Sequence, residues 1–205
     1  MASSWRYGRP RQDPLSDLVE HRVEVGAATF TILRPADPDE LLDEVAFENN
    51  EFLPYWAQLW PSALELVEAL PLDLAGVSVI EVGCGLGIPS LVAASRGAEV
   101  VATDWAPEAI ELLHENARRN DLVVDARQAD WRTFTGNFDL AIAADVLYEE
   151  RNVAPLLALL PRLAPITLLA DPGRPHAKLF FAAAPEHWNI SPAGQRVSRL
   201  ERRVE

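Results

Sequence analysis

The sequence predicts a doubly wound α/β fold, with a mostly parallel sheet between two helical layers and a hairpin and helix in front of it. From residue 77 onward, short β-branched and apolar runs alternate with segments of helical periodicity. This alternation is typical of parallel strands joined by right-handed crossovers. A glycine-rich turn follows the first of these strands, and an aspartate ends the second. Ligands of such sheets bind beyond the carboxyl ends of the strands, so these residues mark a candidate site.

The segment before the core is expected to contribute only small elements. Residues 1–20 are polar and contain proline, and we expect them to be flexible; residues 21–205 are expected to form a single domain. Residues 21–33 alternate in part and contain a glycine, which favours a short hairpin. Residues 39–50 favour a short acidic helix. In the segment PYWAQLWPSALELVEAL, Pro61 suits the first turn of a helix, where no N–H is needed.

The core elements follow in order along the chain. Strands are expected at 77–82, 99–103, 122–126, 138–143 and 166–170, and helices at 88–95, 107–119 and 152–163. Residues 187–190 favour a sixth strand. The last ten residues, RVSRLERRVE, alternate poorly, so a seventh strand is expected to be either short and arginine-rich or incomplete.

Composition narrows the class of protein. Of 205 residues, 49% are hydrophobic and 24% charged, the balance of a globular domain. The net charge of −13 argues against nucleic acid as the main partner, although arginines near both ends leave a contact with RNA or an acidic protein open. The single cysteine, Cys84, fits a reducing compartment. No signal peptide or membrane span is expected, because the longest apolar stretch is broken by prolines. We therefore expect a cytoplasmic protein.

The glycine-rich turn has the spacing E-x-G-x-G-x-G, formed by Glu81, Gly83, Gly85 and Gly87. Glycine permits a sharp backbone turn and the close approach of a ligand. The dinucleotide fingerprint would need its third glycine at position 88, where the chain has Ile88. The carboxylate of Glu81 would repel a diphosphate and attract an ammonium group. The turn therefore favours a ligand with an amino-acid end over NAD.

Asp104 ends the next strand and is placed to accept hydrogen bonds from two ribose hydroxyls. A ligand that combines a ribose with an amino-acid end is S-adenosylmethionine, whose demethylated product is S-adenosylhomocysteine. The alternative is a structural glycine turn in an α/β protein that binds no nucleotide.

Five segments carry a resemblance to a known family: YWAQLWPSALEL, IEVGCGLGIPSL, VVATDW, ADWRTF and FDLAIAADVLYEE. Over residues 21–172 the chain resembles the class I, seven-β-strand methyltransferases of Rossmann-like fold. Within them it is similar to the lysine-methyltransferase-like family, whose Asp-x-x-Tyr motif corresponds here to Asp145 and Tyr148. In that family Trp60 would border the cofactor pocket, Asp130 would reach the adenine amino group, and Trp131 would line the pocket. The resemblance implies that the cofactor contacts Trp60, Glu81, Gly83, Gly85, Gly87, Asp104, Trp105, Asp130, Trp131 and Ala144.

The same resemblance implies that Asp145 and Tyr148 carry catalysis. Methyl transfer is an in-line displacement, so the protein mainly has to align the reactants, and no metal or covalent intermediate is required. An acceptor amine must arrive neutral, and Asp145 would orient it or accept its proton. Tyr148 would supply a hydrogen bond or an aromatic wall. The alternative is structural, with Asp145 capping the next helix and Tyr148 packed beneath it. The four histidines are scattered without ligand spacing, so no metal site is expected.

Three functions remain open. The first is N-methylation of a protein lysine, which the Asp-x-x-Tyr motif favours. The second is methylation of a small molecule, and the third is a binding module that keeps the fold without catalysis. A wide open groove beyond Asp145 would favour a protein acceptor, and a lidded pocket would favour a metabolite.

Overall fold

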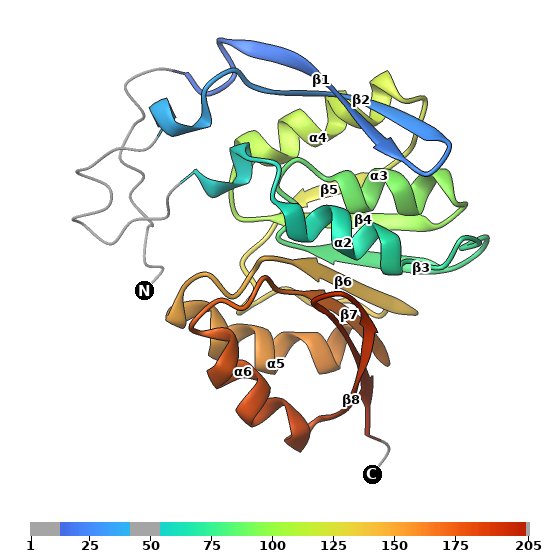
Figure 1. Cartoon of the computed structure of the whole chain (residues 1–205), viewed down its shortest axis with the longest axis vertical. Coiled ribbons are helices and arrows are strands. Elements are labelled where there is room, and N and C mark those ends of the chain that lie inside the picture. The colour runs from blue at the N-terminus through green and yellow to red at the C-terminus, as the bar shows by residue number, and fades with distance from the viewer. Residues whose placement is uncertain (1–12, 42–53, 204–205) are drawn as a thin grey trace.

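The computed structural model describes residues 13–41 and 54–203, and its centre is a seven-stranded sheet (Figure 1). The strands are β3 (Ser78–Val82), β4 (Glu99–Asp104), β5 (Asp125–Gln128), β6 (Leu140–Ala144), β7 (Ile166–Ala170), β8 (Trp188–Gly194) and β9 (Val197–Arg202). Their order across the sheet is β5-β4-β3-β6-β7-β9-β8. All neighbours are parallel except β9, which runs antiparallel to both β7 and β8. From β3 the chain adds β4 and β5 on one side, and it then returns to add β6 and β7 on the other side of β3. This strand order confirms the doubly wound fold.

Helices cover both faces of this sheet. They are α2 (Pro61–Ala69), α3 (Ile88–Ser95), α4 (Pro107–Arg119), α5 (Val153–Leu163) and α6 (Ala177–Ala183). Val79 belongs to the apolar cluster that includes buried residues of α2, α3 and α4, whereas its neighbour Ile80 belongs to the cluster of α5 and α6. A central strand buried on both faces reads as a continuous apolar run, which is why β3 could be recognised from its composition.

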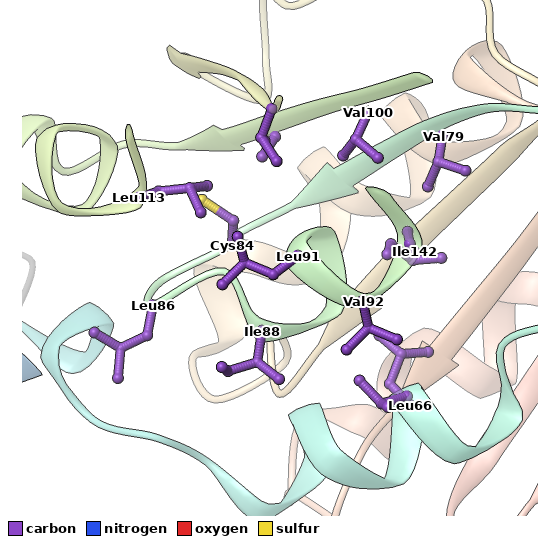
Figure 2. Close-up of a cluster of buried hydrophobic side chains, with 14 of the residues drawn as sticks. Leu66, Val79, Cys84, Leu86, Ile88, Leu91, Val92, Val100, Leu113 and Ile142 are labelled. Atoms are coloured by element: carbon purple, nitrogen blue, oxygen red, sulfur yellow. The ribbon is translucent and has the colours of Figure 1, made fainter. Parts of the chain in front are cut away.

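Cys84 lies in the first of these clusters. Figure 2 shows its sulfur directed toward Leu113, with Leu91 close by. The residue is 6% exposed, and burial raises the pKa of its thiol well above the ordinary value. Cys84 therefore packs as a small apolar side chain and is not a nucleophile.

The end of the chain completes the sheet. The residues of β9 pair with β7 from Val197 opposite Ala170 to Glu201 opposite Ile166. Val197 packs into one apolar cluster and Leu200 into the other, so β9 contacts both helical layers. A strand that is buried on both faces need not alternate, which is why RVSRLERRVE gave a weak strand signal. Of the two alternatives, a short, arginine-rich strand or an incomplete one, the structure has the first: β9 pairs with both β7 and β8.

Several expected boundaries differ from the structure. The third strand begins at Asp125 instead of 122, because residues 122–124 connect it to α4 and Val123 is 87% exposed. The hairpin is longer than 21–33: β1 spans Leu18–Val25 and β2 spans Ala28–Pro35, so β1 begins inside the segment expected to be flexible. The helix expected at 39–50 lies mostly outside the described residues, and its described part is a short 3-10 helix, Pro38–Leu41. Within the described ranges, none of the helices combines the length and apolarity that a membrane span requires.

The hairpin β1–β2 lies beside α4 (Figure 1), and two asparagine side chains bind its strand β2. Asn116 accepts a hydrogen bond from the N–H of Leu33 at 2.7 Å and donates one to its carbonyl at 3.2 Å. Asn120 repeats this pattern with Thr31, at 2.9 and 2.8 Å. The side-chain amides thus substitute for a neighbouring strand along β2. An isolated two-stranded hairpin is only marginally stable in water, so these bonds hold it against the core.

Replacing Asn116 by alanine tests this attachment. Asn116→Ala removes both bonds to Leu33 and leaves the Leu33 backbone groups without their partners. We expect it to lower the free energy of unfolding by about 2–4 kcal/mol, measured by urea denaturation. Glu111→Ala, which changes an exposed side chain on the same helix, should stay within about 0.5 kcal/mol of the wild type. Equal stability of the two variants would show that the hairpin is held by other contacts.

Candidate functional site

A pocket lies at the carboxyl ends of β3, β4 and β6, where the strand order reverses. Eleven of the twelve predicted site residues line it: Trp60, Glu81, Gly83, Gly85, Gly87, Asp104, Trp105, Trp131, Ala144, Asp145 and Tyr148. The segment from Tyr55 to Ala63, which leads into α2, forms a further wall. The parallel sheet brings together residues that are far apart in sequence, because each follows the same end of a neighbouring strand.

The glycine turn between β3 and α3 adopts left-handed backbone conformations. Gly83, Gly85 and Gly87 have φ values of 73°, 51° and 75°. A Cβ on Gly87 would lie 2.3 Å from Leu113, and one on Gly83 would lie 2.8 Å from Val146. The glycines are therefore required by backbone conformation and by contact with the protein itself. The space that they open is filled by the protein, so their presence alone does not demonstrate a ligand.

Glu81 is almost fully buried at the end of β3, with 1% exposure. One of its carboxyl oxygens accepts hydrogen bonds from the N–H of Ser90, at 2.9 Å, and from the Ser90 hydroxyl. Burial raises the pKa of Glu81 to about 8, against the opposing effect of these two bonds. In the free protein the group is therefore largely protonated at neutral pH. A cationic group in the pocket would stabilise its ionised form.

Asp104 ends β4 and is 4% exposed. Its Oδ2 accepts a hydrogen bond from the N–H of Gly85 at 2.9 Å, and its Oδ1 accepts one from the N–H of Ala106 at 3.0 Å. Burial raises the pKa of this carboxyl, while these backbone bonds oppose the rise. Asp104 therefore holds the glycine turn against the end of β4. A carboxylate has about four lone-pair sites, so Asp104 keeps acceptor capacity for a ligand besides its bonds to backbone N–H groups.

Aromatic rings form the opposite wall of the pocket. Tyr55 lies edge-on to Trp60, with ring centroids 6.1 Å apart, and edge-on to Tyr148 at 5.2 Å. The indole N–H of Trp60 donates to the carbonyl of Tyr55 at 2.9 Å. Burial is the main cause that raises the pKa of Tyr148, so its phenol stays protonated and can donate a hydrogen bond. Tyr148 lines the pocket and does not simply pack beneath a helix.

Asp145 follows β6 with a left-handed backbone, φ 56°, which is uncommon outside glycine. Its N–H donates to the carbonyl of Ala170 at 2.9 Å, and its carboxylate binds the guanidinium of Arg174 through two hydrogen bonds of 2.7 and 2.9 Å. Arg174 also lies 5.3 Å from the ring centre of Trp60. The carboxylate therefore faces the pocket and does not cap the next helix.

Asp130 is the predicted residue that does not belong to the described pocket lining. Its carboxylate forms an ion pair with Arg132 and also accepts the Arg132 N–H at 2.9 Å. These local bonds turn the side chain toward the surface, where it is 38% exposed. Its neighbour Trp131 does line the pocket, and the Trp131 indole N–H is buried without a hydrogen-bond partner among the described residues.

Three residues that sequence reasoning missed complete the site: Tyr55, Ser90 and Arg174. Tyr55 lies in the quoted segment YWAQLW, but nothing in its spacing distinguished it from Trp60. Arg174 lies in the segment ADPGRP after β7, and nothing in the spacing of that segment marks the arginine as a site residue. Among the described residues, no cluster of three or more histidine, cysteine or acidic side chains is arranged to hold a metal ion.

Solved structures have the same fold. The T. thermophilus 16S rRNA N2 G1207 methyltransferase, solved with AdoMet and guanosine, aligns with a TM-score of 0.64 and 20% identity, over 92% of this chain and 51% of that one. At this level of identity the likeness shows the fold: the sheet and its helical layers are those of a class I methyltransferase.

The sequence comparisons identify the family. Residues 55–170, from the aromatic wall of the pocket to the end of β7, match the lysine methyltransferase family. EEF1A lysine methyltransferase 3 of Mus musculus is 32% identical over 139 residues, which are 62% of this chain and 55% of that protein. Protein-lysine methyltransferase METTL21E of Mus musculus is 34% identical over 133 residues, which are 56% and 54%. The chain belongs to the lysine methyltransferase family, and it spans about half the length of the curated relatives it matches.

The burial of Glu81 predicts a specific pH dependence of stability. Its pKa is about 8 in the folded protein and near 4.5 when unfolded, so between these values unfolding releases a proton. The free energy of unfolding should fall as pH rises from 5 to 8, by up to about 1.4 kcal/mol per pH unit from this group. Glu81→Gln keeps an acceptor for Ser90 and removes the titration. Its stability relative to the wild type should therefore increase from pH 5 to pH 8, measured by urea denaturation.

The difference between the two proteins isolates Glu81, because Asp104 and Asp171 also have raised pKa values and remain in both. If the difference in the free energy of unfolding between Glu81→Gln and the wild type stays constant across this pH range, Glu81 is ionised in the free protein.

Proposed function

We propose that this chain is an S-adenosylmethionine-dependent methyltransferase that N-methylates a lysine side chain of a protein. The observation that carries the proposal is the pocket itself: two buried carboxyls, Glu81 and Asp104, flank the glycine turn, and Asp145 lies at the mouth of the same pocket. The family to which the chain belongs supports the reaction class.

The pocket residues fit this cofactor. Glu81 is a buried acid without a cation, suited to an ammonium group, and Asp104 has acceptor capacity for ribose hydroxyls. The partnerless N–H of Trp131 offers a further hydrogen-bond donor. Trp60, Trp105 and Ala144 supply apolar walls. Asp130 would have to break its bonds with Arg132 to reach an adenine ring. Of the residues proposed to contact the cofactor, it therefore has the least support.

Bound S-adenosylmethionine supplies an electrophilic methyl group. The chain's own residues would then bring a neutral amine in line with it and exclude water. Asp145 would accept a hydrogen bond from the amine and orient its lone pair. The protonated phenol of Tyr148 and the rings of Tyr55 and Trp60 would surround the cation that develops on the acceptor nitrogen.

An open groove next to the pocket supports a protein acceptor. It has a volume of about 570 Å³, shares Arg174 with the ion pair at the pocket mouth, and continues between α6 and the hairpin β8–β9. Phe181, Ile190 and Pro192 give it an apolar lining. A surface of this shape can receive an extended segment of polypeptide beside the acceptor lysine, whereas a metabolite would need a closed pocket.

Thermal unfolding with candidate ligands tests the cofactor. S-adenosylmethionine or S-adenosylhomocysteine at about a hundred times its Kd should stabilise the protein by about 2.7 kcal/mol, which raises Tm by several degrees. NAD should leave Tm unchanged, because the turn has Ile88 where the dinucleotide fingerprint needs its third glycine and because the Glu81 carboxyl lies beside the turn. Unchanged Tm with both adenosyl ligands would favour the non-catalytic binding module.

Asp104→Ala should weaken binding of S-adenosylhomocysteine by more than tenfold, measured by calorimetry, because it removes the charged acceptor for the ribose. Asp139→Ala is the matched control: Asp139 also accepts a backbone bond, from Ser78 at 2.9 Å, but at the opposite end of the sheet. Equal affinities of the two variants would remove the ribose assignment.

Asp145→Asn should keep cofactor affinity and lose turnover. The assay is transfer of labelled methyl from S-adenosylmethionine to proteins of a cell lysate, followed by identification of methylated lysine. Undiminished turnover of the variant would show that Asp145 is structural. Label found only in the small-molecule fraction would overturn the protein acceptor and leave the methyltransferase.

A further inference from the structure

Arg174 binds Asp145 and lies over Trp60 at the mouth of the pocket. Its Nε donates to Oδ1 of Asp145 at 2.7 Å, and its Nη2 donates to Oδ2 at 2.9 Å. The Asp145 side chain is 3% exposed and that of Arg174 is 32% exposed. The pair therefore lies at the boundary between the pocket and solvent, with the carboxylate on the inner side.

The position of Arg174 is fixed from two directions. Asp171 Oδ1 accepts the backbone N–H groups of Gly173 and Arg174, at 2.7 and 2.8 Å, which sets the turn after β7. The guanidinium lies over Trp60, 5.3 Å from the ring centre. Because both its backbone and its planar end are held, Arg174 presents its two donors to Asp145 in one geometry.

This geometry leaves Asp145 with unused acceptor capacity. A carboxylate has about four lone-pair sites, and the guanidinium occupies one on each oxygen. Asp145 lines the pocket, so the remaining sites are available to a group inside it. Two parallel hydrogen bonds from one planar guanidinium fix the orientation of the carboxylate, and with it the direction of the remaining lone pairs.

We propose that Arg174 is a positioning residue: its bidentate bond fixes the orientation of the Asp145 carboxylate and aims the free lone pairs of that carboxylate at the methyl acceptor. Asp171 supports this arrangement by setting the turn after β7. The inference rests on the proposed function, in which Asp145 receives the acceptor amine. Arg174 lies beyond residues 55–170, the segment that matches the family, so this role is assigned from the contacts of this chain alone.

The first test is kinetic, with Arg174→Gln and Arg174→Lys assayed on whichever lysate fraction the wild type labels. Arg174→Gln should lower kcat at least tenfold while the Kd for S-adenosylhomocysteine stays within twofold. The acidic limb of its pH–rate profile should move to higher pH, because loss of a neighbouring cation favours the protonated form of a buried carboxyl. Arg174→Lys keeps the charge and should recover part of kcat.

Arg199→Gln is the matched control, because it breaks another arginine–carboxylate pair, with Glu201 at 2.8 Å, outside the pocket lining. Its kcat and pH profile should equal those of the wild type. Other groups that act on the Asp145–Arg174 pair or line the same pocket are unchanged in every variant: Tyr55, Glu81, Asp104, Tyr148 and Asp171. A wild-type kcat and pH profile in Arg174→Gln would overturn the proposal. So would a faster enzyme, because Arg174 would then obstruct the acceptor.

A second test needs no turnover and separates the two proposals. Arg174→Gln, Asp145→Asn and the double variant are unfolded with urea at pH 5 and pH 8. Arg174→Gln should lose more stability at pH 8 than at pH 5, because it leaves a buried carboxylate unpaired, and this difference should vanish in the Asp145→Asn background. Additive losses that do not depend on pH would overturn the role of Arg174. Absence of methyl transfer by the wild type, with this coupling intact, would overturn only the proposed function.

Discussion

The carboxylate of Asp104 connects the three parts that define the pocket. By accepting the N–H groups of Gly85 and Ala106, it fastens the glycine turn to the end of β4 and to the start of α4. The turn can adopt left-handed conformations because glycines stand at the three positions that require them. The hydrogen bond from Gly85 to the buried Asp104 carboxylate fixes the turn in place. Glu81 enters the same space from β3, so two acids share a site of low polarity. Both carboxyls are raised in pKa by burial, which makes the free protein receptive to a ligand that brings a cation and hydroxyl donors.

The two ends of the pocket are built on different principles. At the β3–β4 end, the acids lack a cation and are held mainly by bonds to backbone and to Ser90. At the β6–β7 end, the acid is already paired, since Asp145 binds Arg174 through both oxygens. An unpaired buried acid is suited to binding a charged ligand, whereas a paired one keeps a fixed charge and geometry through a reaction. This division agrees with a cofactor at the first end and an acceptor at the second.

Sequence patterns located most of the fold because its central strands and helices have local signals. The boundaries of α3, α4 and β7 agree with those expected, since proline lies in the first turn of both helices and β7 is a short apolar run between breaks. The elements that the sequence located less well are β5 at one edge of the sheet, β9 next to the other edge, and the separate hairpin β1–β2. Residues 122–124 are apolar but connect α4 to β5, and β9 contacts two helical layers without alternating. Hairpin β1–β2 extends beyond residues 21–33 because the strands pair as far as Leu18 opposite Pro35. Asn116 and Asn120 support β2 from more than eighty residues away.

The sequence by itself determined the order of strands and helices, the glycine turn and the acids at the strand ends, because each depends on residues close together in the chain. It also carried the motifs by which the family could be recognised. Only the tertiary structure decided which of these residues share a pocket and in what state. The pairing of Asp145 with Arg174 joins residues 29 positions apart, and it exists because β6 and β7 are neighbours in the sheet. Asp130 pairs locally, with Arg132, and the structure does not include it among the residues that line the pocket, which its motif did not reveal. Burial, and pairing between distant residues, are properties of the packed molecule, so no local pattern could specify them.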